Sequence, residues 1–419
     1  MRRPIALATL IIALCVSIFL RTARTTFNYG CGYDGQFYCR MLNGDLVPAP
    51  YNRRVLTVGL AWPLHQLNLT TGTAFLVVDL MALTVSAVLV WVLVDRLASQ
   101  FGALKPEITL AAVAAAGVVL LNPATLRTAL AAPVVTDDVG LAALLLALTV
   151  MTGQRPLLTA PLAFVATLAR EANAAPLLVG ALALLVGADK RIRLVVMTSV
   201  IAVAAGAAIA LQRPHLEGSY GTVSQIRTIL DMHLSRKGAT SLVWNAVSGL
   251  TFLVFVIFTH RRRLLHNWKK IRVLLAAGIA NAGMALIGGY DTARLLLPTA
   301  VIITIIALAS AAAWSKTRMP AVLLFLSILL WRPLDFVGSN FFEQLVPFLS
   351  PQQLAGSSRV ITRAISDLLL LVAGVTGLAI FYAIEKLCRQ VAKSPSVFGT
   401  RSRTMTLECD PLPRCGDFR

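Results

Sequence analysis

An aspartate and several arginines lie close together in the polar segment that follows the first apolar run of the chain. Asp34 lies within residues 31–39 (CGYDGQFYC), and Arg40 and the pair Arg53-Arg54 follow. Guanidinium groups bind phosphate through paired hydrogen bonds, and a carboxylate can accept the proton of an attacking hydroxyl. This combination suits a reaction on a phosphate-bearing lipid. The structural alternative is an Asp-Gly turn with arginines that meet lipid headgroups.

Further charged groups interrupt the apolar runs later in the chain. They are Asp137-Asp138, Arg170-Glu171, and Asp291 with Arg294. Charged side chains beside membrane spans are costly and are typical of functional sites. The last two groups also have a structural interpretation as internal ion pairs, Arg170 with Glu171 and Asp291 with Arg294. We expect all of these groups on one side of the membrane, together with Asp34.

The cysteines and histidines give weaker indications. Cys31 and Cys39 bracket the segment around Asp34, and the spacing leaves open whether they form a disulfide or remain two free thiols. The five histidines have no metal-ligand spacing. The chain contains neither a G-x-x-x-x-G-K-[ST] nor a G-x-G-x-x-G loop, so nothing indicates nucleotide binding.

The elements that position these residues must be membrane helices. Hydrophobic residues make up 57% of the 419 residues against 14% charged, which is too apolar for a soluble domain. The apolar runs lack the alternation of barrel strands, so we predict an all-α polytopic protein. About twelve spans are expected, near 4–20, 73–94, 108–122, 139–152, 157–169, 173–187, 194–211, 243–259, 273–289, 295–314, 319–331 and 364–384.

The distribution of charge predicts the orientation. The densest basic run, 260–272, joins two apolar segments, and with the N-terminus in the cytoplasm most lysines and arginines fall inside. This pattern is a topology signal and argues against nucleic acid as the partner of a chain with net charge +19. The transmembrane domain is then 1–385. Its long outer loops are 21–72, 212–242 and 332–363, and 386–419 is a basic, disordered cytoplasmic tail.

One apolar stretch within the first outer loop needs a separate interpretation. Val55 to Leu69 is short for a crossing and is interrupted by Pro63. If it crossed the membrane, the basic run 260–272 would face outward, against the positive-inside rule. We therefore predict a helix that lies at the outer interface.

The runs YDGQFY (33–38) and YNRRVL (51–56) resemble a group of bacterial multi-spanning proteins classed with the GT-C glycosyltransferases. Weaker similarity continues through Asp137-Asp138 and Arg170-Glu171 to Asp291-Thr-Ala-Arg294. The resemblance implies a GT-C-like helical enzyme of the bacterial cytoplasmic membrane with both termini in the cytoplasm. Such an enzyme takes a sugar from a polyprenyl-phosphate donor and attaches it, usually with inversion, to a lipid or glycan acceptor on the outer side.

The same resemblance implies roles for single residues. Asp34 would be the general base, and Asp137 or Asp138 would hold the acceptor or a metal. We expect the remaining candidates to bind substrate: Tyr33, Gln36, Tyr38, Arg40, Arg53, Arg54, Arg170, Glu171, Asp291 and Arg294. The alternative function is a secondary transporter of a small or lipid-linked solute. It is less favoured because we find no paired halves, and Asp79 is almost the only charge within a predicted span.

Overall fold

The computed structural model describes residues 31, 35–48, 51–121, 137–153, 156–185, 190–211, 227, 231, 253–287 and 295–315. All of them belong to one unit, Met1–Ala379. Every regular element in these ranges is a helix, which confirms the all-α prediction for this part of the chain. The predicted spans near 4–20, 319–331 and 364–384, the loop 332–363 and the tail 386–419 lie outside the described residues, as does most of the loop 212–242.

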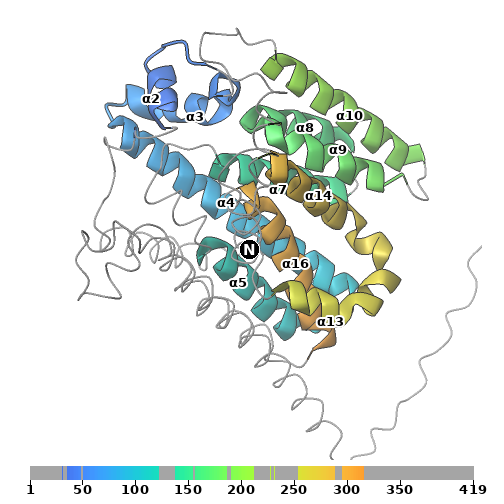
Figure 1. The fold of residues 1–419 in the computed structure, drawn as a ribbon. Coiled ribbons are helices and arrows are strands. Elements are labelled where there is room, and N and C mark those ends of the chain that lie inside the picture. The colour runs from blue at the N-terminus through green and yellow to red at the C-terminus, as the bar shows by residue number, and fades with distance from the viewer. Residues whose placement is uncertain are drawn as a thin grey trace, which may run out of the picture. The chain divides into compact units, whose positions relative to one another are not determined.

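The described part contains eleven α-helices (Figure 1), together with the short 3-10 helices η2 (Tyr51–Arg53) and η4 (Glu171–Asn173). In chain order the α-helices are α2 (Gly35–Leu42), α3 (Val55–Gln66), α4 (Thr71–Gln100), α5 (Lys105–Leu121), α7 (Asp137–Thr152), α8 (Pro156–Ala169), α9 (Ala174–Ala183), α10 (Lys190–Leu211), α13 (Leu253–His266), α14 (Trp268–Ile287) and α16 (Leu297–Trp314).

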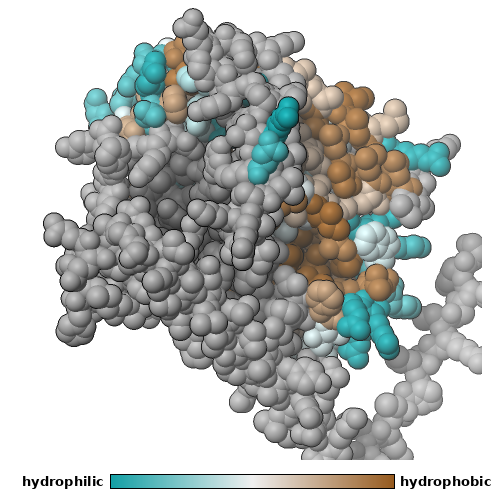
Figure 2. Space-filling view, viewed as in Figure 1, coloured by the Kyte–Doolittle hydropathy of each residue, from teal (hydrophilic) through white to brown (hydrophobic). Residues whose placement is uncertain are grey.

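Three described helices are long and apolar enough to cross a membrane. They include Thr71–Gln100, Ile192–Ile209 and Leu297–Trp314, each of which matches a predicted span. Leu158–Ala169 and Glu171–Ala183 are shorter apolar helices. The outward faces are apolar as well: Met197 and Ile201 on α10 and Ile279 on α14 are each more than 60% exposed. Figure 2 shows such brown side chains gathered on one face, a surface that suits lipid better than water.

The segment 21–72, predicted as an outer loop and called the first outer segment after that prediction, is largely helical in its described residues. The helix predicted over 55–69 is present as α3, Val55–Gln66, which confirms the helix if not its depth in the membrane. The chain then turns at Asn68, whose φ is 65°, and the Thr70 hydroxyl caps α4 by accepting a hydrogen bond from Thr73 N at 3.4 Å. Figure 1 shows α2 and α3 beside the beginning of α4.

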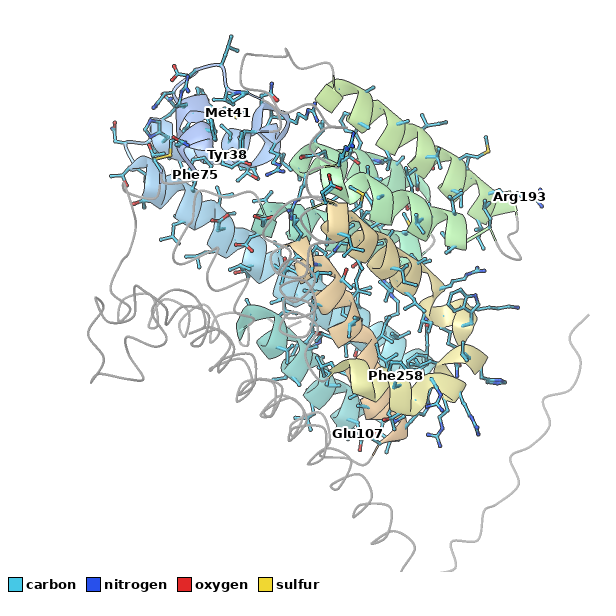
Figure 3. All side chains as sticks on the ribbon, in the orientation of Figure 1. Tyr38, Met41, Phe75, Glu107, Arg193 and Phe258 are labelled. Atoms are coloured by element: carbon cyan, nitrogen blue, oxygen red, sulfur yellow. A yellow bond between two sulfur atoms is a disulfide. The ribbon has the colours of Figure 1, made fainter. Side chains whose placement is uncertain are left out.

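Helix α4 is the element that organises this part of the chain. It packs against α3, α5, α7 and α16, and the last of these is buried over most of its length. At the beginning of α4, Phe75 and Val78 pack with Tyr38 and Leu42 of α2 in one apolar cluster (Figure 3). This cluster fixes the first outer segment onto the end of the helix bundle.

Contacts at the two ends of α4 show that α7 runs parallel to it. Near its beginning, Asp79 lies within electrostatic range of Asp137 and Asp138, in the first turn of α7. Near its end, Arg96 Nη1 donates hydrogen bonds to Thr149 O at 2.8 Å and Thr152 Oγ1 at 3.1 Å, in the last turn of α7. Two helices that cross a membrane in the same direction need a helix of opposite direction between them in the chain. The predicted order of spans has one, at 108–122.

The basic residues of 260–272 lie at the opposite end of α4 from Asp79. Lys270 Nζ donates to Gln100 O at 2.7 Å, and Phe101 packs on Trp314 with ring centroids 4.6 Å apart. The predicted spans 243–259 and 273–289 stop outside the basic run, but α13 and α14 continue through it and leave only Asn267 between them. Arginine and lysine have good helix propensity, and long side chains can carry their charges to the membrane boundary without ending a helix.

Candidate functional site

Six of the candidate residues are gathered at one end of the helix bundle. They come from four places in the sequence: Tyr38 on α2, Arg54 before α3, Asp137 and Asp138 in the first turn of α7, and Arg170 and Glu171 at the junction of α8 and η4. Hydrogen bonds, ion pairs and charge interactions connect them. We call this group, with Asp79, the charged cluster.

Arg54 and Glu171 form the most exposed ion pair of the charged cluster. Arg54 Nη2 donates to Glu171 Oε1 at 2.9 Å, and Arg54 Nε lies 3.2–3.3 Å from both carboxylate oxygens. The two side chains are 14% and 29% exposed. This fork-to-fork geometry is the strong form of a charge-assisted hydrogen bond, so the pair holds the start of α3 against η4.

Tyr38 connects this pair to the first outer segment. Arg54 Nη1 donates to the Tyr38 hydroxyl oxygen at 2.9 Å, and Tyr38 is almost fully buried. Its ring meets the edge of Tyr51, while Phe37 stacks on Tyr51 with centroids 4.1 Å apart. The next residue, Cys39, forms a disulfide with Cys31, so of the two alternatives that the sequence left open the structure has the bridge. Helix α2 is therefore fixed to the site by a hydrogen bond, ring contacts and a covalent link.

Arg170 and Asp137 form a second ion pair that is almost entirely buried. Their side chains are 5% and 3% exposed. Gly140, one turn into α7, makes the approach possible, because a Cβ at that position would lie 3.1 Å from Arg170 Cβ and 3.2 Å from its Cδ. Asn173 Nδ2 donates to Gly140 O and to Ala166 O, each at 2.9 Å, which joins α7 and α8 beside the pair.

The two ion pairs influence each other electrostatically. Asp137 acts on the charge of Arg54, and Arg170 acts on that of Glu171. Burial raises the pKa of the Glu171 carboxyl, but attraction and hydrogen bonds from Arg54 outweigh burial, so the pKa lies below its ordinary value. Glu171 is therefore ionised at neutral pH, and the charged cluster is one network of two guanidinium and four carboxyl groups.

The sequence did not single out Asp79 as a site residue. It lies on α4, is fully buried, and faces Asp138 and Asp137. The signal was present, because a carboxylate inside an apolar span is costly and marks function by default. Asp79 can be assigned to the charged cluster only once α4 and α7 are known to lie side by side.

Other predicted site residues lie at the surface or outside the described part. Gln36 and Arg40 are exposed on α2, where Arg40 Nε lies 3.4 Å from Asp45 Oδ2, and Arg53 is partly exposed. Arg40 and Arg53 are thus accessible cations in the segment that also contains Tyr38 and Arg54. Tyr33, Asp34, Asp291 and Arg294 lie outside the described residues.

The ion-pair expectation for Arg170-Glu171 needs a correction in its partners. The salt bridges connect Arg170 to Asp137 and Glu171 to Arg54, which are residues far away in the sequence. Adjacent residues at a helix junction point in different directions, so each charge is available to a different element. Within the described residues no group of three His, Cys, Asp or Glu side chains has a geometry that could hold a metal ion.

Comparison with known proteins leaves the interpretation to the residues themselves. A scan against protein-family models and a search of curated proteins both found no match to the chain.

Proposed function

We propose that the protein is a membrane glycosyltransferase that moves a sugar from a polyprenyl-phosphate carrier to a lipid or glycan acceptor on the extracytoplasmic side. The observation that carries the proposal is the gathering of Tyr38, Arg54, Asp137, Arg170 and Glu171 at one end of the bundle. Residues up to 133 positions apart in the sequence thus form one polar site. Five charges or hydroxyls in an apolar bundle carry a large desolvation cost, which function explains better than stability.

The chemistry follows from the residue types. The acceptor hydroxyl would attack the anomeric carbon and break its bond to the phosphate oxygen, while the hydroxyl proton passes to the Asp34 carboxylate. The carrier phosphate leaves as an anion. Arg40 and Arg53 are the accessible cations that would neutralise it, whereas Arg54 is already engaged by Glu171 and holds the segment in position. The energy comes from the donor itself, so no nucleotide is needed.

The sidedness of the bundle supports an extracytoplasmic reaction. The charged cluster and the Cys31–Cys39 disulfide lie at one end of α4, and the basic residues near Lys270 lie at the other. Disulfides persist in oxidising compartments, and basic segments favour the cytoplasmic face. Both rules support a charged cluster on the outside of a bacterial cytoplasmic membrane. In this proposal both termini lie in the cytoplasm and membrane lipids surround the apolar faces.

The decisive experiment replaces the proposed base in cells. Asp34→Asn should abolish the glycan or lipid-linked product while protein level and membrane insertion stay normal. Asp45→Asn is the matched control, because Asp45 is an exposed carboxylate of the same segment that pairs only loosely with Arg40. Unchanged surface glycans and lipid-linked sugars in Asp34→Asn cells, measured by mass spectrometry, would refute the transferase.

A secondary transporter is the alternative, and the buried Asp79 is the observation that favours it. An ionisable residue inside a span is typical of ion-coupled transport. A transporter would show solute uptake that depends on an ion gradient and is lost in Asp79→Asn. Uptake that persists after the gradient is collapsed would argue against this alternative.

A further inference from the structure

Asp79 is the one residue of the charged cluster whose carboxylate has no bonding partner. It is 0% exposed, and neither of its oxygens accepts a hydrogen bond. Ser86 lies seven residues further along α4, hence on the same helix face, and its hydroxyl is also fully buried and without a hydrogen-bond partner. Two unsatisfied polar groups on one face of an apolar helix are an exception that needs an explanation.

The neighbouring charges do not supply that explanation. The groups that act on Asp79 are the carboxylates of Asp138 and Asp137, which repel it when ionised. The guanidinium of Arg170 is already bound to Asp137, and no arginine is among the groups that act on Asp79. A buried polar group without a hydrogen-bond partner costs several kcal/mol in general, and a bound molecule with donor groups would remove that cost.

We propose that Asp79 is a ligand-binding carboxylate that accepts hydrogen bonds from hydroxyl groups of the transferred sugar. The inference rests on the proposed function and deepens it, because it assigns the sugar end of the donor to Asp79, near the first turn of α7. Vicinal hydroxyls are neutral donors in pairs, which suits the two free oxygens of one carboxylate. A divalent cation fits less well, since no three ligating side chains converge within the described residues.

The position of Asp79 along α4 agrees with this role. It is eight residues from the start of the helix, a rise of about 12 Å, and α4 spans about 45 Å in total. A helix of that length exceeds the hydrocarbon core of about 30 Å, so its first turns can lie in the headgroup region. A sugar held at Asp79 would then lie just inside the outer boundary, where the carrier phosphate can remain among headgroups near Arg53.

The test measures binding by the full-length protein in lipid nanodiscs. The probes are undecaprenyl phosphate that carries glucose, mannose or arabinose, and undecaprenyl phosphate without a sugar. We expect Asp79→Asn to weaken binding of the sugar-bearing lipid about tenfold and to leave binding of the bare carrier unchanged. Asp95→Asn is the control, because it makes the same change on an exposed residue of the same helix. Circular dichroism and gel filtration verify that both variants fold.

Each result has one meaning. If the wild-type protein binds the sugar-bearing lipid and Asp79→Asn binds it equally well, the role of Asp79 is refuted and the transferase proposal stands. If Asp79→Asn loses both lipids equally, Asp79 does not recognise the sugar. If binding requires sodium in the wild type but not in Asp79→Asn, the site holds a cation instead. If the wild type binds none of the sugar-bearing lipids, both proposals fail.

Discussion

Arg54 and Glu171 lie 117 positions apart in the sequence, yet the Arg54 guanidinium donates three hydrogen bonds to the Glu171 carboxylate, the shortest at 2.9 Å. The contact joins the start of α3 to the junction of α8 and η4. It also positions the Tyr38 hydroxyl, which accepts from the remaining Arg54 nitrogen. A single pair of side chains therefore couples the first outer segment to the later helices.

The first prediction concerns the energy of this pair. Arg54→Ala and Glu171→Gln should each lower the free energy of unfolding by about 2 kcal/mol, because each leaves a largely buried partner group unsatisfied. The double variant should cost less than the sum, with a coupling energy of about 1–2 kcal/mol. Thermal unfolding of the purified protein in detergent measures all three. Arg53→Ala, at the partly exposed neighbour, should change stability by about 0.5 kcal/mol or less. Additive losses would show that the pair carries no energy.

The second prediction concerns acid stability. The pKa of Glu171 in the folded protein is below its ordinary value, which is about 4.3 in an unfolded chain. The stabilisation it gives is therefore fully present above that unfolded value and is lost as the pH falls through the folded pKa. The melting temperature of the wild type should fall more steeply between about pH 5 and pH 3 than that of Glu171→Gln. Parallel curves for the two proteins would contradict this assignment.

The third prediction concerns the close approach at Gly140. Gly140→Ala adds a Cβ 3.1 Å from the Cβ of Arg170, so Arg170 must shift by a few tenths of an ångström and its pairing with Asp137 weakens. We expect a loss of about 1 kcal/mol for alanine and about 3 kcal/mol for valine. Gly283→Ala on α14 is the control, because a Cβ there meets nothing within 4 Å and alanine favours a helix. Equal melting temperatures for Gly140→Val and the wild type would overturn this account.

The fourth prediction concerns the bridge between Cys31 and Cys39. It closes a short loop around the YDGQFY run, so its removal should cost about 2–3 kcal/mol through the entropy of the unfolded chain. Cys31→Ser, Cys39→Ser and the double variant should show the same lower melting temperature, and reductant should bring the wild type to that value. A wild-type melting temperature that does not respond to reductant would indicate that the bridge adds no stability.

The sequence predicted the helices well where composition decides. The boundaries of α7 and α8 agree with the predicted spans to within two residues, since lipid solvation requires helices and polar breaks end them. Helix α4 continues six residues beyond its predicted end at residue 94. Positively charged residues did not end a helix, so α13 and α14 run on through 260–272, beyond the predicted spans 243–259 and 273–289. Low hydropathy marks the end of a membrane span there, but arginine and lysine have good helix propensity and the helices continue.

Apart from Asp79, the residues of the charged cluster were candidates from the sequence alone. The contacts between them were not predicted. Charge cost alone identified Arg170 and Glu171, whereas their partners Asp137 and Arg54 depend on which helices lie side by side. Asp79 shows the same limit. Its position relative to α7 follows from the parallel packing of two helices separated by α5, which no local pattern specifies.

The last prediction concerns orientation, on which the proposed chemistry depends. Gln36 on α2 and Arg262 on α13 are both exposed, and they belong to opposite ends of α4. With Cys15, Cys388, Cys409 and Cys415 replaced by serine, a membrane-impermeant maleimide should label Gln36→Cys in intact cells. Arg262→Cys should react only after the membrane is permeabilised, because positively charged segments are retained in the cytoplasm.

The reverse labelling pattern would be inconsistent with the transferase. It would place the segment that contains Asp34 in the cytosol, where the Cys31–Cys39 disulfide would be reduced. Labelling of both positions in intact cells would instead indicate an even number of crossings between them. Contacts at the two ends of α4 exclude that pattern if α4 spans the bilayer, because α2 packs at its beginning and Lys270 contacts Gln100 at its end.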